Sequence, residues 1–250
     1  MIKRTPMQKL LVRFICCFIP NRKLRHKIRN GMQRYQIIGS GNKIYVGQTE
    51  LKSIVPGLNI IISGNNNIIR LPTVPKFENS FIRIVANNVK ISISDSTHKM
   101  RWLHINAICG DGQHCLIGRN FHCHGVNVQL NEENAALEIG DDCLFSNSIS
   151  IWPTDGHSIL DMKTGDILNM LSGPVTIGNH CWVGEGVRIL KNARIPSNTI
   201  VGGGCVVGKR FETEYTAIAG NPARVVRENV TWDSLNPMHL IKRRKENKND

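Results

Sequence analysis

The sequence predicts an all-β fold, a parallel β-helix built from six-residue repeats. Between residues 177 and 208 every sixth position is aliphatic, and a glycine often follows it directly. Neither an α-helix, with a period of 3.6, nor an amphipathic strand, with a period of 2, produces this spacing. In a parallel β-helix the aliphatic residue points into a narrow prism, and the glycine relieves a crowded corner. The repeat positions are Ile177, Val183, Ile189, Ile195, Val201 and Val207, and the glycines are Gly178, Gly184, Gly202 and Gly208.

Residues 1–35 are predicted to form a basic amphipathic segment that precedes the β-helix. Ten Lys and Arg residues fill the first 34 positions, and no acidic residue occurs before Glu50. The apolar stretch LLVRFICCFI within them is too short to span a bilayer. Residues 1–34 are therefore either a peripheral anchor for an anionic membrane or a helix that is solvated or packs in an oligomer. We expect no nucleic-acid partner, because no stacking motif interleaves aromatic with basic residues.

The β-helix domain is predicted to cover residues 36–212. The six-residue spacing recurs upstream of the regular repeats in a broken form, and Asn-rich turns fit corners that need left-handed backbone angles. A slim prism also suits the low aromatic content of 6% and the 22 glycines. The upstream repeat positions are Ile139, Phe145 and Ile151, preceded by Ile105, Ile117 and Cys123 with Asp111 as an off-type member.

A loop is predicted to interrupt the β-helix at about residues 152–174. Ile151 and Ile177 are 26 residues apart, which is not a multiple of six, and the stretch between them carries proline, glycine and charge. Loops held by a rigid scaffold often carry function. Here His157 could take a proton from a hydroxyl and return it, and Asp155 could orient or polarise the imidazole. A structural role for this histidine stays open. No nucleophile elbow is present, so the sequence does not suggest a covalent acyl-enzyme.

The cysteines indicate a reduced, cytoplasmic protein. Five of them occupy one slot of the repeat, four places after an inward position, where a free thiol behaves as a small hydrophobe. No CxxC pair occurs, which disfavours a zinc ribbon. The five are Cys109, Cys115, Cys143, Cys181 and Cys205.

Three sequence pieces resemble one family. They are the loop WPTDGHSILD, the run IGNHCWVGEGVRIL and the ending VVGKR…AIAGNPARVVRE, which together cover about residues 139–228. The chain is similar to the hexapeptide-repeat acyltransferases, and within them to the bacterial sugar and polysaccharide O-acetyltransferases. The resemblance implies a left-handed parallel β-helix with about 18 residues in each coil, followed by a C-terminal segment, residues 213–250, that contacts coenzyme A.

The resemblance also implies a homotrimer in which acetyl-CoA lies between neighbouring prisms. His157 then matches the family's catalytic base, and Trp182 matches a tryptophan near the thioester and the acceptor. His124 stands where related enzymes often have an acceptor-contacting Asn. No metal is expected. Gly184, Glu185 and Gly203 match positions along the pantetheine arm, and Lys209, Arg224 and Arg227 match basic positions facing the phosphates of coenzyme A.

The function that these patterns predict is an acetyl-CoA-dependent O-acetyltransferase. The acceptor would be a hydroxyl of a bacterial surface polysaccharide or of its sugar precursor, with an acidic, sialic-acid-containing glycan as one candidate. Two alternatives stay open. One is a zinc protein like the γ-class carbonic anhydrases, although no histidine pair shows that family's downstream spacing. The other is a β-helix that serves as a scaffold or binding module, because a fold alone does not fix a function.

Overall fold

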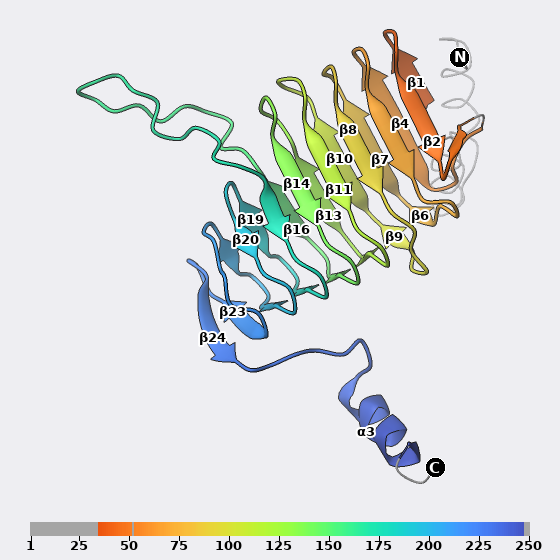
Figure 1. The fold of residues 1–250 in the computed structure, drawn as a ribbon, viewed down its shortest axis with the longest axis vertical. Coiled ribbons are helices and arrows are strands. Elements are labelled where there is room, and N and C mark those ends of the chain that lie inside the picture. The colour runs from red at the N-terminus through yellow and green to blue at the C-terminus, as the bar shows by residue number, and fades with distance from the viewer. Residues whose placement is uncertain (1–34, 52, 248–250) are drawn as a thin grey trace, which may run out of the picture.

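The computed structural model describes residues 35–51 and 53–247. These form a slender prism with three largely parallel β-sheets as its sides, and each complete coil of the chain adds one strand to each sheet (Figure 1). The predicted basic segment, residues 1–35, lies outside the described residues apart from Tyr35. The all-β architecture with a protruding loop is the one that the six-residue repeat predicts.

Each sheet of the described chain contains eight strands, and sequential coils supply neighbouring strands. Sheet A contains β1 (Tyr35–Ile38), β4 (Leu58–Ser63), β7 (Ser80–Ile84), β10 (Leu103–Ala107), β13 (Val126–Gln129), β16 (Ile149–Trp152), β19 (Arg188–Leu190) and β22 (Val206–Val207). Sheet B contains β3 (Thr49–Glu50), β2 (Lys43–Val46), β5 (Ile68–Leu71), β8 (Lys90–Ile93), β11 (His114–Ile117), β14 (Ala136–Ile139), β17 (Val175–Ile177) and β20 (Arg194–Ile195). Sheet C contains β6 (Phe77–Glu78), β9 (Met100–Arg101), β12 (His122–Cys123), β15 (Leu144–Phe145), β18 (Trp182–Val183), β21 (Ile200–Val201), β23 (Thr216–Ala219) and β24 (Arg224–Glu228).

The number of residues per coil explains why the repeat is regular only near the C-terminal end. Ile177 pairs with Ile195, so this coil contains 18 residues, or three six-residue repeats. Upstream, Val126 pairs with Ile149, and that coil contains 23 residues. The additional residues lie at the corners, because the strands themselves stay in register. The corner position of Asp111, between β10 and β11, follows from this and accounts for its break in the apolar pattern.

The core consists of the inward-facing side chains of the three sheets, which are stacked along the axis of the prism. Along β4, buried and half-buried residues alternate, as a strand with one face inward requires. Phe121 and Phe145 are fully buried on successive coils, with ring centroids 5.0 Å apart in an edge-to-face arrangement. The cysteine slot is mostly inward as expected, since Cys115, Cys143, Cys181 and Cys205 are buried and free, but Cys109 is exposed.

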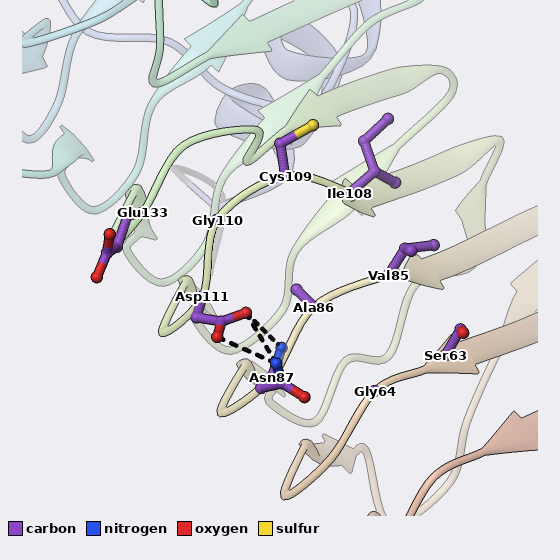
Figure 2. A pocket seen from close by; sticks show the side chains of 10 residues that line it. All are labelled: Ser63, Gly64, Val85, Ala86, Asn87, Ile108, Cys109, Gly110, Asp111 and Glu133. Atoms are coloured by element: carbon purple, nitrogen blue, oxygen red, sulfur yellow. Dashed lines mark hydrogen bonds between the residues drawn. The ribbon is translucent and has the colours of Figure 1, made fainter.

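Asparagine and aspartate side chains tie the corners of neighbouring coils together. The backbone N–H of Asn65 donates to Asn87 Oδ1 at 2.8 Å, and the backbone N–H of Asn87 donates to Asp111 Oδ1 at 2.8 Å. Bonds from the Asn87 backbone and side chain also lower the pKa of Asp111. Figure 2 shows this pair beside a shallow hollow of about 440 Å³. The hollow contains none of the predicted site residues. Its Asn87 and Asp111 side chains form hydrogen bonds that connect the corners of neighbouring coils.

The C-terminal segment leaves the prism. After β23, strand β24 turns back and pairs antiparallel with it, at the end of sheet C. The chain then extends to α3 (Pro237–Glu246), which buries none of its residues and lies beyond the prism in Figure 1. Asn236 caps this helix by accepting from the backbone N–H of His239. In the part of the chain described here, no helix is long and apolar enough to cross a bilayer.

Candidate active site

The predicted loop is a long hairpin-like arm between β16 and β17. It leaves the corner between sheets A and B and extends well away from the strands in Figure 1. A bridge between Leu160 and Ile167 holds its two sides together, and Asp161 accepts from two backbone N–H groups at the tip. The arm is unusually apolar for an exposed segment. The exposed apolar side chains are Ile159, Leu160, Met162, Ile167, Leu168 and Met170.

The coil that follows the loop anchors its base through Lys191. The Lys191 ammonium, with only 9% of the side chain exposed, pairs with the Asp155 carboxylate and donates to the Asn169 carbonyl at 2.6 Å. The pKa of Asp155 is lowered by this lysine. The Asn169 amide in turn donates to Asp155 Oδ2 and to the His157 carbonyl, both at 2.8 Å. The Asp155 carboxylate therefore anchors the loop, and its predicted role toward the imidazole stays a prediction.

The coil that precedes the loop holds the same base from the other side. The buried Thr154 hydroxyl donates to Glu132 Oε2 at 2.7 Å and accepts from the Gly156 N–H at 2.9 Å. Glu132, Thr154 and His157 all line one pocket of about 350 Å³ at the foot of the arm. Two coils thus fix the backbone on either side of His157, while its side chain stays exposed.

Trp182 lies on a different face, the outer surface of sheet C. It pairs in register with Leu144 on one side and Ile200 on the other, and 39% of the side chain is exposed. The C-terminal segment folds back over this face. The Trp232 ring stacks on His180 at 4.6 Å and lies 6.3 Å from the Trp182 ring, and its indole N–H donates to the His180 carbonyl. Trp182 therefore belongs to an aromatic group of three rings.

Gly184, Glu185 and Gly203 meet at the corner between sheets C and A. A Cβ atom added to Gly184 would lie 2.7 Å from the Gly203 nitrogen, so only glycine allows the coils to approach this closely. The Glu185 carbonyl accepts from the Gly204 N–H at 2.7 Å. The backbones of successive coils therefore lie in close contact beside Trp182, and Glu185 and Gly203 are exposed at this corner.

The three predicted phosphate-binding cations are all exposed, on two separate parts of the prism. Arg224 and Arg227 lie on β24, at the end of sheet C. Lys209 follows β22, and its Nζ lies 5.0 Å from the centre of the Phe211 ring. Lys209 is thus near the corner between sheets A and B, where the loop arises on an earlier coil.

Within one chain the structure does not bring His157 and Trp182 together. His157 belongs to the corner between sheets A and B, whereas Trp182 faces outward from sheet C, with sheet A between them. His124 shares sheet C's outer face with Trp182, since β12 and β18 both pair with β15. Among the described residues, no group of three or more His, Cys, Asp and Glu side chains is placed to hold a metal ion.

Comparison with known proteins gives this geometry a family. The chain is 31% identical over 203 residues to the polysialic acid O-acetyltransferase of Neisseria meningitidis, covering 81% of this chain and 90% of that protein. The chain belongs to the hexapeptide-repeat O-acetyltransferases. The fold of a crystallised polysialic acid O-acetyltransferase matches this enzyme with a TM-score of 0.68 and 26% identity, over 86% of this chain and 99% of that one. The galactoside O-acetyltransferase of Escherichia coli K12 is 34% identical over 119 residues, 47% of this chain and 55% of that protein. No protein-family model matches the sequence.

Sequence reasoning missed three residues of this acetyltransferase that surround the predicted site. Glu132 and Lys191 contact the loop across 22 and 36 residues of sequence, and Trp232 reaches His180 across 52. Glu132 and Thr154 are about one upstream coil apart in the sequence. Their contact could have been predicted only if the length of the upstream coils had been known. Nothing local in the sequence marks Lys191 or Trp232.

Replacing Glu132 with alanine should lower turnover of the enzyme about tenfold, because the Thr154 hydroxyl loses its acceptor and the backbone before His157 loosens. Glu133→Ala is the matched control, since Glu133 is exposed and contacts neither Thr154 nor the loop pocket. Steady-state kinetics with saturating donor should show the loss in kcat for Glu132→Ala alone. Equal kcat values in the two variants would contradict the anchoring role of Glu132.

Proposed function

We propose that this enzyme transfers the acetyl group of acetyl-CoA to a hydroxyl of a bacterial surface polysaccharide or of its sugar precursor. An acidic, sialic-acid-containing glycan is the first candidate, because two relatives are named for polysialic acid. The observation that carries the proposal is His157, exposed beside a pocket on a loop whose base is fixed by Glu132 and Lys191. A rigid loop that presents an imidazole is suited to general-base catalysis.

Acetyl transfer would proceed directly, in a complex of the enzyme with both substrates. His157 removes the proton from the acceptor hydroxyl as the oxygen bonds to the thioester carbonyl carbon. The tetrahedral intermediate then collapses, the carbon–sulfur bond breaks, and the imidazolium returns its proton to the departing thiolate. For the oxyanion, the Gly184 N–H is already bonded to the Val201 carbonyl. The indole N–H of Trp182, which has no hydrogen-bond partner among the described residues, is the better donor.

The donor would lie along the corner beside Trp182 that contains Gly184, Glu185 and Gly203. Gly203 is exposed there and has no side chain, so it leaves room for a pantetheine arm that Glu185 would border. Arg224 and Arg227 stand exposed on the same sheet and would meet the phosphates as charge-assisted donors. Lys209 would join them from a neighbouring chain, because it lies near a different corner of its own prism.

A homotrimer would complete the site. His157 and Trp182 face different sides of one chain, so a catalytic unit containing both needs the loop of one copy to reach the sheet C face of the next. The six exposed apolar side chains of the arm support the same assembly, because the described part of the chain leaves them uncovered. A cyclic arrangement of three copies would bury all three arms and close the assembly.

We place the enzyme in the cytoplasm. Residues 1–34, with their ten basic side chains, would hold it reversibly at an anionic membrane surface where lipid-linked glycans are made.

Replacing Arg224 with alanine should raise the KM for acetyl-CoA about tenfold, equivalent to ~1.4 kcal/mol, because one phosphate contact is lost. The KM for the glycan and the kcat should stay near the wild-type values. Arg243→Ala on the exposed helix α3 is the control for removing a positive charge elsewhere. A change confined to the glycan KM would show that β24 faces the acceptor and not the donor.

The direct test of the proposed function is incubation of the full-length enzyme with radiolabelled acetyl-CoA and a panel of acidic and neutral polysaccharides. Label should enter at least one polysaccharide in a form that mild alkali releases, as expected for an O-acetyl ester. The absence of transfer to every acceptor, with no release of free coenzyme A, would overturn the proposal.

A further inference from the structure

Three imidazoles form a group, the histidine stack, on the outer face of sheet C. The rings of His98 and His122 are parallel to within 6°, with centroids 4.7 Å apart. The His124 ring lies 4.7 Å from His122 and is tilted by 48° to it. His98 and His124 are exposed, and His122 is half-buried between them. Protonation of more than one of these closely spaced rings would place like charges beside one another, and a bound anion would offset that repulsion.

The stack lies on the same face as Trp182. His122 pairs in register with Leu144, and Leu144 pairs with Trp182, so the three side chains occupy successive rungs of one column. Two rungs of a parallel sheet correspond to about 10 Å. A glycan lying along the column could thus present one sugar to the Trp182 region while a neighbouring sugar rests on the histidines.

The charges around the stack are mostly positive. Arg101 lies beside it, and one carboxylate, Glu78, is shared between Lys99 at 3.3 Å and Arg101 at 3.4 Å. Opposite His122 on the next coil is the uncharged Leu144. Burial and the neighbours His98, His124 and Arg101 lower the pKa of His122 to about 4. No hydrogen bond joins the three imidazoles to another side chain of the described residues, so their N–H groups remain available.

We propose that His98, His122 and His124 form a subsite that binds a carboxylate of an acidic glycan acceptor, two rungs along sheet C from Trp182. The proposal rests on the proposed function, because it assumes a polysaccharide acceptor. A bound carboxylate accepts from the N–H groups of the rings and favours the charged form of His122, because it offsets the repulsion that opposes that charge. Glycan binding and proton uptake are therefore coupled, and the subsite selects acidic over neutral acceptors.

The sign of this coupling follows from linkage. An anionic ligand raises the pKa of His122 above its lowered value in the free enzyme, so the complex holds more protons than the separate partners. Affinity for the glycan should then increase as the pH falls from about 8 to about 5.5. A neutral glycan of the same backbone should show no such dependence.

The first experiment uses the wild-type enzyme without acetyl-CoA. Calorimetric titration with polysialic acid, and with polysialic acid whose carboxyl groups have been reduced to alcohols, measures the contribution of the carboxylates. At about pH 5.5 we expect the enzyme to bind polysialic acid at least tenfold more tightly than the carboxyl-reduced polymer. Net proton uptake on binding should be detected by comparing two buffers of different ionisation enthalpy. Equal affinities for the two polymers, or binding without proton uptake, would overturn the proposal.

The second experiment uses the double variant His98→Gln/His122→Gln. Glutamine keeps a polar side chain but cannot gain the charge, and His114→Gln, on sheet B, is the matched control. The double variant should lose proton uptake and raise the glycan KM about tenfold, with the acetyl-CoA KM unchanged. A rise in the acetyl-CoA KM instead would assign the stack to the donor phosphates and reject the proposal. If the variant does not fold, the wild-type comparison of the two polymers decides.

The two proposals fail in different ways. If the wild-type enzyme acetylates no polysaccharide, the proposed function is wrong. If the enzyme acetylates polysialic acid and carboxyl-reduced polysialic acid with the same KM at about pH 8 and at about pH 5.5, the proposed function stands and the proposed subsite is wrong.

Discussion

Replacing His157 with alanine lowers turnover by ~10²-fold or more, because the acceptor hydroxyl then loses its proton to water during attack on the thioester. Folding and affinity for acetyl-CoA stay unchanged, since the His157 side chain is exposed and forms no hydrogen bond with the described residues. The measurement is kcat at saturating concentrations of both substrates, together with the dissociation constant of coenzyme A. His239→Ala, on helix α3, is the control.

Mixing inactive chains tests whether the site is shared between copies. If the proposed homotrimer shares its sites, His157→Ala chains and Trp182→Ala chains, each of low activity alone, should regain activity when they are co-expressed with different affinity tags and isolated as mixed assemblies. Recovery requires that one copy supply the loop and another supply the sheet C face. Mixed assemblies that stay as inactive as the parent variants would contradict the shared site. Turnover near the wild-type value in His157→Ala alone would remove the histidine from the mechanism.

Replacing Lys191 with methionine also lowers turnover, by up to about 10²-fold, although Lys191 contacts neither substrate in the proposed mechanism. The ammonium holds Asp155 and the Asn169 carbonyl at the two sides of the loop base, so its loss frees both sides and displaces His157. Lys163→Met, at the exposed tip of the arm, is the matched control. The loss should appear in kcat. Both KM values should change by less than about twofold, because Lys191 does not bind either substrate in the ground state.

A double-mutant cycle separates the two roles open to Asp155. If Asp155 acts by anchoring the loop, Asp155→Asn combined with Lys191→Met costs less than the sum of the two single changes, because the Lys191–Asp155 ion pair is lost in all three variants. If Asp155 instead polarises the His157 imidazole, Asp155→Asn is much more harmful than Lys191→Met, and the two effects multiply. Because Lys191 lowers the pKa of Asp155, the anchored state is present above the unfolded pKa and is lost as the pH falls through the folded value.

The fold could be predicted because the prism interior imposes one rule at every coil. Positions such as Ile177 and Ile195 face the same file of side chains, so their spacing records the coil length directly. The loop was predictable for the same reason, since a break in the spacing between Ile151 and Ile177 marks added residues. The longer upstream coils were not, because residues added at corners carry no apolar pattern of their own.

The site was only partly predictable, and the missing part has a physical cause. His157 is marked by its loop and by a family resemblance, but the partners that fix the loop come from other coils. Glu132 and Lys191 contact the loop only because the chain winds around the prism between them and the loop. The sequence next to either residue does not indicate how many residues that coil contains. The stack of His98, His122 and His124 is hidden in the same way.

The number of stacked coils sets the length of the prism in this enzyme. Each coil contacts chiefly the coils before and after it, so a whole coil can be added or removed as a unit. The coils from β1 to β8 contain none of the residues placed in the catalytic or donor sites, and they end beside the histidine stack. Changing their number would lengthen or shorten the face available to a polymer without moving the chemistry. The height of the prism is thus a variable that natural selection or design can adjust separately from catalysis.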